Sequence, residues 1–352
     1  MNIDSIKGQI KPLDKVSVEQ ARSRWISVAK PLFSLGKLEA AVVQMAGIKR
    51  TPDYTLNKKG LVIMCADNGV VAEGVTQTGQ GVTAVVAENF TKDAASVCLM
   101  SQVAGVDVLP VDIGMTVDVS ALSRSGQKVA YGTRNFAQEP AMSIAEAEKA
   151  VQIGIEMVAE LKKAGYEILA TGEMGIGNTT TGSAVASVLL NKEAELMTGK
   201  GAGLDQAGLR RKIAVIEKAI RKHQPDPDNV LDVLAKVGGL DIAGLTGVFL
   251  GGAVHGVPVI IDGFISSVAA LCAARISDHA KGYMIPSHQS REPGGRILLD
   301  AMGFTPFLTC EMFLGEGSGA VALLPLLDMA LKVYREMGTF EENRIDQYQI
   351  LQ

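Results

Sequence analysis

The run Leu61-Val-Ile-Met-Cys65, followed directly by Ala66-Asp67-Asn68-Gly69, decides the fold class. Five successive apolar residues with β-branched members are typical of a strand that is buried on both faces of a parallel sheet. The polar residues that follow predict a loop at the carboxyl end of this strand. Further strands are expected over residues 106–111, where Pro110 disfavours pairing at the centre, and over residues 167–171 and 257–261.

Helical patterns separate the expected strands. The longest covers residues 17–47, where apolar residues recur at three- and four-residue steps and Trp25 would anchor the helix in a core. A capping box at Ser143 and Glu146 opens a helix that reaches Lys163. Further helices are expected over residues 183–190, 205–223, 242–254, 264–276 and 321–337. This alternation predicts an α/β fold with a doubly wound, mainly parallel sheet flanked by helices.

The bulk composition is that of an ordinary globular protein. The 352 residues are 47% apolar and 20% charged. The net charge of -4 argues against a nucleic-acid-binding protein, which would usually present a basic face. The N-terminal residues are polar, and the longest apolar runs are interrupted before they could span a membrane. We therefore expect a cytoplasmic protein that has neither nucleic acid nor a membrane as a partner.

The cysteines and histidines form no metal-binding pattern. The cysteines lack CxxC spacing and lie in apolar surroundings, so all are expected to be buried free thiols: Cys65, Cys98, Cys272 and Cys310. The histidines have no ligand spacing, and His255 and His288 are expected to be structural or substrate-facing. We expect neither a metal nor a cofactor.

The strongest candidate for a phosphate site is the segment TGEMGIGNTTT at residues 171–181, which follows an expected strand and precedes a helix. The groups expected to bind phosphate are backbone N–H groups and hydroxyls at the helix N-terminus: Gly175, Gly177, Asn178, Thr179 and Thr180. Lys212 would add a counter-charge. The segment matches neither the Walker loop nor the dinucleotide fingerprint. The alternative is a tight turn that needs glycine only for packing.

A second glycine-rich segment, LGEGSGA at residues 314–320, places one carboxylate between glycines before a helix. Glycine lets the backbone turn tightly and lets a ligand approach, so Glu316 is a candidate general base, and Ser318 is a candidate N-cap. The alternative is a helix start whose glutamate only favours the helix dipole. The same two interpretations apply to Glu173 in the first segment. Polar loops at residues 67–83 and 286–294 are further candidates, because long loops at strand ends usually bind a ligand.

Several segments together resemble the nicotinate-nucleotide:dimethylbenzimidazole phosphoribosyltransferases of cobamide (vitamin B12) assembly. They run in the family's order over residues 30–325: Lys30-Pro31 with Ser34-Leu-Gly-Lys-Leu-Glu39, Ala66-Asp-Asn-Gly-Val-Val-Ala-Glu-Gly-Val75, Asn135-Phe-Ala with Glu139-Pro-Ala-Met142, Gly172-Glu-Met-Gly-Ile-Gly-Asn-Thr-Thr180, Asp262-Gly-Phe264, Ser287-His288 with Glu292-Pro-Gly294, and Leu314-Gly-Glu-Gly-Ser-Gly-Ala320.

The resemblance implies transfer of the phosphoribosyl group of nicotinate mononucleotide to an aromatic base, without a cofactor, by a homodimer. It implies a Rossmann-like catalytic domain at residues 56–325 and a small helical domain built from residues 1–55 and 326–352. Glu316, with Glu173, would be catalytic. Phosphate and ribose would contact Gly175, Ile176, Gly177, Asn178, Thr179, Thr180, Lys212, Ser290 and Gly315, and the base would contact Thr78, Gln80, Met174 and Leu314.

The chain departs from the family pattern at three places. Asn68 stands where histidine is common, Leu32-Phe33 where a Pro-Gly pair is usual, and Thr78-Gly79-Gln80-Gly81 where an aromatic-Pro-Gln-Glu stretch is common. The two glycines of the last segment predict a reshaped base pocket.

Other functions are therefore kept as alternatives. The same chemistry on a phenolic or purine acceptor is one, and a non-catalytic nucleotide-binding partner subunit is another. A nicotinamide-dependent oxidoreductase is disfavoured because the glycines lie late in the chain and no acidic residue follows at the required strand end.

Overall fold

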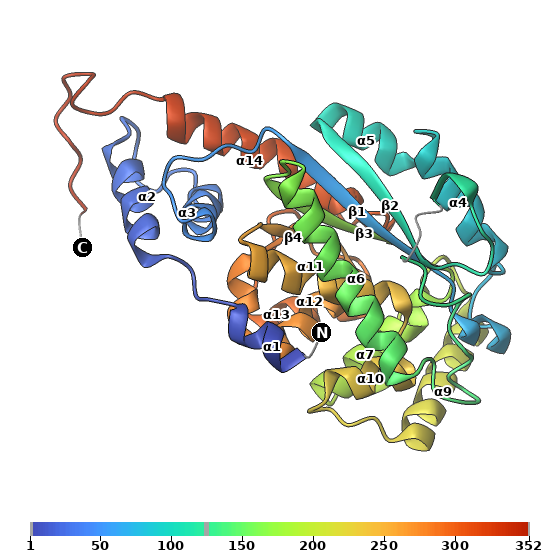
Figure 1. Cartoon of the computed structure of the whole chain (residues 1–352). Coiled ribbons are helices and arrows are strands. Elements are labelled where there is room, and N and C mark those ends of the chain that lie inside the picture. Colours follow the sequence, from blue (N-terminus) through green and yellow to red (C-terminus); the bar gives the residue numbers. More distant parts are fainter. Residues whose placement is uncertain (1–2, 123–126, 351–352) are drawn as a thin grey trace.

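A five-stranded parallel sheet with helices on both faces forms the body of the protein (Figure 1). The computed structural model describes residues 3–122 and 127–350. The strands are β1 (Lys59–Ala66), β2 (Val106–Gly114), β3 (Ile168–Met174), β4 (Val259–Ile261) and β5 (Met284–Pro286), in the order β2-β1-β3-β4-β5. All four strand pairs are parallel. The predicted doubly wound α/β fold is confirmed.

Fourteen α-helices and three short 3-10 helices, η1 (Gly69–Glu73), η2 (Ser120–Leu122) and η3 (Asp278–Tyr283), are present in the described residues. The α-helices are α1 (Ile3–Gln9), α2 (Lys15–Ser27), α3 (Lys37–Lys49), α4 (Gly81–Thr91), α5 (Ser96–Ala104), α6 (Ile144–Lys163), α7 (Asn178–Leu190), α8 (Ala194–Met197), α9 (Gln206–His223), α10 (Val230–Val237), α11 (Leu240–His255), α12 (Phe264–Ile276), α13 (Pro293–Met302) and α14 (Ser318–Glu336). The expected capping box of α6 is present.

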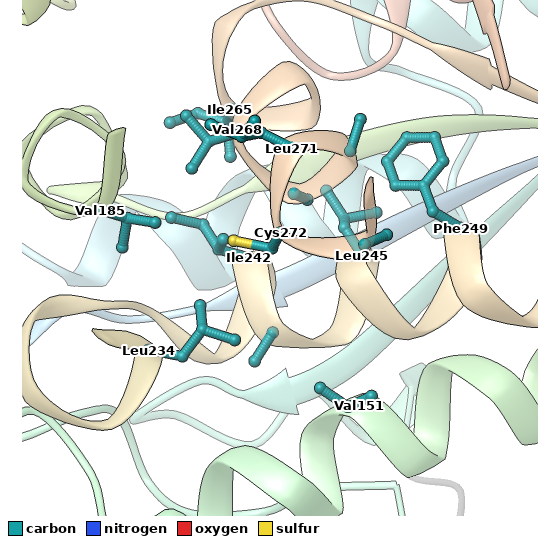
Figure 2. Packing of buried hydrophobic residues seen from close by; sticks show 14 of the residues in the cluster. Val151, Val185, Leu234, Ile242, Leu245, Phe249, Ile265, Val268, Leu271 and Cys272 are labelled. Atoms are coloured by element: carbon teal, nitrogen blue, oxygen red, sulfur yellow. The ribbon is translucent and has the colours of Figure 1, made fainter. Parts of the chain in front are cut away.

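The central strand β1 separates two hydrophobic cores, because successive side chains of a strand point to opposite faces. Val62 and Met64 belong to the core under α6, α11 and α12, whereas Leu61 and Ile63 belong to the core under α3, α5 and α14. Figure 2 shows the first core, with Phe249 of α11 among its side chains. The continuous apolar run of β1 is therefore explained by burial on both faces.

Glycines allow α6 and α11 to pack unusually closely on one face of the sheet. A Cβ atom at Gly154 of α6 would lie 2.1 Å from the carbonyl oxygen of Gly244 in α11. In the other direction, a Cβ atom at Gly247 would lie 2.0 Å from the carbonyl oxygen of Val151. Any side chain at these positions would push the two backbones apart.

The prediction of one helix over residues 17–47 is wrong, since α2 and α3 are separate. Proline has no N–H and disfavours helical geometry at the residue before it, and Pro31 lies in the connection. Val28 is extended, with ψ of 129°, and pairs in an isolated bridge with Thr339 near the C-terminus. The predicted anchoring of Trp25 is confirmed, because its side chain is buried against Tyr334 of α14.

The proposed small domain, residues 1–55 with 326–352, stays a prediction. Its helices α2 and α3 lie beside the C-terminal half of α14 at one end of the molecule (Figure 1). However, α14 continues without interruption across the proposed boundary at residue 326, although Pro325 lies inside it. The N-terminal α1 packs against α11 of the main body.

Three further differences have simple physical reasons. Strand β5 was not predicted, because a three-residue strand carries no periodic pattern. The helices α1, α4, α5, α8, α10 and α13 were not predicted either, and all of them have eleven residues or fewer. Pro110 is accommodated inside β2 because β2 is an edge strand that pairs only with β1. The thiol of Cys310 is exposed, so the prediction of four buried cysteines is wrong at that residue.

Among the described helices, none is long and apolar enough to cross a membrane.

Replacing Gly154 by alanine should lower the free energy of unfolding by about 2 to 3 kcal/mol, because the new methyl group overpacks the contact between α6 and α11. Denaturant unfolding measures this change. Gly8→Ala is the matched control, since a Cβ atom at Gly8 meets no other atom within 4 Å and alanine should stabilise this helix slightly. Equal unfolding midpoints for the two variants would contradict the proposed close packing.

Candidate active site

A cavity of about 220 Å³ lies over the carboxyl ends of β3, β4 and β5, where ligands bind in sheets of this type. It contains ten of the residues predicted for the site: Glu173, Met174, Gly175, Ile176, Asn178, Thr179, Ser290, Leu314, Gly315 and Glu316. Asp262, His288 and Glu292 also line it. The two glycine-rich segments, which lie far apart in the sequence, thus face one space.

The backbone of Glu316 is held in a strained conformation. Its φ angle is 61°, and its glycine neighbours have φ of 84° and 91°. A left-handed conformation costs a non-glycine residue roughly 1 kcal/mol or more. The turn also packs directly on β3, because a Cβ atom at Gly172 would lie 2.5 Å from the carbonyl oxygen of Glu316. This close contact fixes the position of the glutamate relative to the sheet.

The carboxylate of Glu316 is half-buried at the beginning of α5. Its Oε2 accepts a hydrogen bond from the N–H of Val97 at 3.4 Å. Burial raises the pKa of Glu316 above the ordinary glutamate value, and the Val97 N–H opposes this effect. A carboxylate with a raised pKa is a better proton acceptor than an ordinary one.

Asp262, which follows β4, caps the helix that carries the Glu316 turn. Its Oδ1 accepts hydrogen bonds from the N–H groups of Gly319 at 2.8 Å and Ala320 at 3.0 Å. The prediction that Ser318 caps α14 is therefore wrong: Gly317 occupies the N-cap, and the buried Ser318 hydroxyl has no partner in the described part of the chain. The Asp262 carboxylate accepts hydrogen bonds from N–H groups of the first turn, which the side chain of an N-cap residue would normally accept.

The glycine turn after β3 lies where it was predicted. However, some of the N–H groups that were predicted to bind phosphate already donate hydrogen bonds within the protein. Gly177 has φ of 92° and begins α7. The N–H of Ile176 donates to the Thr83 hydroxyl at 3.2 Å, and that of Asn178 donates to the carbonyl oxygen of Gly175 at 3.1 Å. The Thr180 hydroxyl is buried and lines no cavity at the site. Thr179 lines the cavity and is the hydroxyl of this turn that a ligand can reach.

Lys212 reaches the turn from α9, although it is fully buried. Its Nζ donates to the Thr179 hydroxyl at 2.8 Å and to the carbonyl oxygen of Gly199 at 3.2 Å. Burial lowers the pKa of Lys212 to about 8, so the ammonium form still predominates at pH 7. This arrangement places a positive charge directly behind the turn, as predicted for a phosphate site.

Glu173 lies at the end of β3, between the glycine turn and the Glu316 turn. Its Oε2 accepts a hydrogen bond from the side-chain amide of Asn178, and the same nitrogen donates to Asp241 at 3.2 Å. Burial, and after it the charge of Asp241, raises the pKa of Glu173 to about 8. Asp241 had no sequence signal, because its contact with the site is a hydrogen bond between the first turns of α11 and α7, which lie far apart in the sequence.

The residues predicted to contact the base lie in different places. Met174 and Leu314 line the main cavity. Thr78 lines an adjoining cavity of about 90 Å³ together with Lys200, and the two cavities share the glycine turn. Gln80 lines neither, because its side chain donates to the carbonyl oxygen of Asn68 at 3.1 Å. No cluster of three or more metal-ligating side chains is found among residues 3–122 and 127–350.

Asp262→Ala should lower the free energy of unfolding by about 1 to 2 kcal/mol through the loss of the helix cap. It should also lower kcat by about 100-fold, because the Glu316 turn loses its anchor and a small misplacement is costly. Denaturant unfolding and steady-state kinetics measure the two effects. Asp14→Ala is the matched control, since Asp14 caps α2 away from the cavity and should cost stability alone. Equal losses of activity in both variants would contradict a positioning role for Asp262.

Comparison with known proteins agrees with this geometry. A family model described as Phosphoribosyltransferase matches residues 10–345. The nicotinate-nucleotide–dimethylbenzimidazole phosphoribosyltransferase of Ruminiclostridium cellulolyticum is 46% identical over 352 residues, 100% of both chains. That of Acetivibrio thermocellus is 46% identical over 340 residues, 97% of each chain.

Among solved structures, the crystal structure of CobT from Thermus thermophilus superposes with a TM-score of 0.89 at 35% identity, covering 95% of this chain and 100% of that chain. The chain therefore belongs to the nicotinate-nucleotide–dimethylbenzimidazole phosphoribosyltransferase family, as the resemblance predicted.

Proposed function

We propose that the protein transfers the phosphoribosyl group of nicotinate mononucleotide to dimethylbenzimidazole or a related base, for cobamide assembly. The observation that carries this proposal is the shared cavity, in which a half-buried carboxylate faces a glycine turn backed by a buried lysine. The names of the relatives support the choice of donor and acceptor.

The glycine turn and Lys212 would hold the phosphate of the nucleotide. Helix α7 begins at this turn, and a helix N-terminus favours an anion. Thr179 lines the cavity and accepts a hydrogen bond from the ammonium group of Lys212. Lys212 would therefore act on the phosphate through Thr179 and through its charge, because its own side chain is fully buried and lines neither cavity. Ser290 and Gly315, which line the same cavity, are proposed to contact the ribose or phosphate. Holding both groups would align the anomeric carbon for attack.

Glu316 would accept the proton of the incoming base. The attacking ring nitrogen forms a bond to the anomeric carbon while the bond to the nicotinate nitrogen breaks. The electron pair of the broken bond neutralises the pyridinium ring, so nicotinate leaves without needing an acid. The proton on the other ring nitrogen passes to the Glu316 carboxylate, whose raised pKa favours this step. Attack on the face opposite to nicotinate inverts the anomeric centre and yields the α-riboside phosphate.

The accepted base is proposed from the names of the relatives, which favour dimethylbenzimidazole. Phenolic and purine acceptors stay as alternatives, because the loop at residues 76–81 departs from the family pattern. Its Gly79 and Gly81 are exposed, and a Cβ atom at either would meet no other atom within 4 Å. A homodimer is proposed as well, supported by an exposed apolar patch that combines Phe33 with Tyr348 and Ile350.

Glu316→Gln should lower kcat by about 10²- to 10⁴-fold, because the amide cannot accept the ring proton. The affinity for nicotinate mononucleotide should stay within about threefold, since the glycine turn and Lys212 are unchanged. Nicotinate release measures the first quantity and calorimetry the second. Loss of nucleotide affinity together with activity would assign a structural role to Glu316.

The acceptor is tested by assaying nicotinate release with dimethylbenzimidazole, adenine, phenol and para-cresol separately. We expect the highest kcat/KM with dimethylbenzimidazole. Activity only with phenols or adenine would keep the chemistry and change the acceptor. If no acceptor gives release although nicotinate mononucleotide binds, the non-catalytic partner subunit becomes the better interpretation.

A further inference from the structure

We propose that Glu173 enters the reaction in its protonated form, held there by anionic Asp241 through the side-chain amide of Asn178, and donates a hydrogen bond to an oxygen of the bound nucleotide. Glu173 would then be a catalytic residue, and Asp241 and Asn178 would be positioning residues. The inference rests on the proposed function for the identity of the nucleotide. It goes beyond the proposed function by assigning a positioning role to Asp241 and a protonation state to Glu173.

The geometry places two carboxyl groups on one nitrogen. The Asn178 amide donates one hydrogen to Glu173 Oε2 and the other to Asp241 Oδ2, at 3.2 Å in the second case. An amide nitrogen has two hydrogens, and both are used here. Two buried carboxylates this close repel each other strongly, so the pair is expected to share one proton near neutral pH.

Of the two groups, Asp241 is better suited to carry the negative charge. It lies in the first turn of α11, where the helix dipole favours an anion, and its Oδ1 also accepts the N–H of Ile242 at 2.9 Å. Asp241 therefore accepts two hydrogen bonds, whereas Glu173 accepts one. Burial raises the pKa of Asp241 only to about 6, compared with about 8 for Glu173. At pH 7 the proton thus resides mainly on Glu173.

The remaining charged groups around Glu173 act in the same direction. Asp262 after β4 and Glu316 before α14 face Glu173 with like charge, and both raise its pKa. The Cys65 thiol on β1 is neutral, because burial raises its pKa well above the usual value. On the far side of Asp241 lies Asp67, which raises the pKa of Asp241. The imidazole of His288 stands beside Asp262 rather than Glu173.

The negative charge of the substrate explains why a protonated Glu173 would help binding. Nicotinate mononucleotide carries a phosphate and a carboxylate, yet four carboxyl groups line the cavity: Glu173, Asp262, Glu292 and Glu316. The second oxygen of Glu173 points toward the Glu316 turn, since a Cβ atom at Gly315 would lie 2.6 Å from Glu173 Oε1. A proton on this carboxyl group removes one negative charge from the cavity and supplies a donor for an oxygen of the anionic nucleotide.

Kinetics of Glu173 variants test this protonation state. Glutamine resembles the protonated glutamate, so Glu173→Gln should lower kcat/KM at pH 7 by less than about tenfold. It should also weaken the loss of activity near pH 8 and leave only the part that comes from deprotonation of Lys212. Glu173→Ala removes the donor and should lower kcat/KM by about 10- to 100-fold. In the wild type, activity should fall as the pH rises through about 8, since the proton is then lost. Equal losses in the glutamine and alanine variants would overturn the proposal.

Asp241→Asn tests the origin of the effect. Without the anionic neighbour, the pKa of Glu173 should fall, and the alkaline decrease in kcat/KM should move to lower pH by about one unit. The same substitution in the Glu173→Gln background should produce no such shift. Asp232→Asn is the matched control, because Asp232 lies in the first turn of α10 outside the cavity. An unchanged profile in Asp241→Asn would overturn the role of Asp241.

A readout without substrate separates this inference from the proposed function. Infrared difference spectra between about pH 6.5 and pH 9.5, which bracket the titration of Glu173, should show a carboxylic C=O band that disappears at high pH. This band should be absent in Glu173→Gln and should titrate at lower pH in Asp241→Asn. If the wild type shows the band but releases no nicotinate with any acceptor, the proposed function fails while the protonation state holds. If the enzyme turns over and the band is unchanged in Glu173→Gln, the inference fails alone.

Discussion

The carboxylate of Asp262 on the N-terminus of α14 is the interaction on which the site depends. It joins the end of β4 to a helix that starts much later in the chain, through hydrogen bonds to Gly319 and Ala320. The turn before that helix would otherwise be a flexible run of glycines with one strained glutamate. Because the turn is capped at one end and pressed against β3 at Gly172, Glu316 has a defined place over the sheet. Local strain at a functional residue is thus held by tertiary contacts.

The site combines helix N-termini with an unusual number of buried carboxyl groups. Parallel strands place their carboxyl ends at one edge, and α7, α11 and α14 each begin there. The first of these helices would receive phosphate, the second stabilises the charge of Asp241, and the third is capped by Asp262. An anionic substrate can enter such an acidic cavity only if protons and the buried Lys212 offset part of the negative charge.

Close packing by small residues lets the layers come near enough to form this site. Gly154 and Gly247 bring α6 and α11 together, and α11 in turn carries Asp241 into contact with Asn178. At the sheet edge, a Cβ atom at Gly175 would lie 2.4 Å from the carbonyl oxygen of Ala66, so the turn after β3 touches the end of β1. The glycines of this scaffold therefore serve close packing as well as ligand approach.

Local patterns in the sequence predicted β1, β2, β3 and β4, the longer helices α6, α7, α9, α11, α12 and α14, and the two glycine-rich turns. Buried strands and capped helices follow from such patterns, as residues 61–65 and Ser143 with Glu146 show. The six helices α1, α4, α5, α8, α10 and α13 were not predicted. The sequence did not reveal β5, the break between α2 and α3, or the true cap of α14, since short elements and long-range hydrogen bonds leave no periodic trace. The contacts of the folded chain show which oxygens meet at Asn178 and that the Gln80 side chain binds Asn68 instead of reaching the cavity. Those contacts, and the protonation states that follow from them, depend on burial and on distances between residues far apart in the chain.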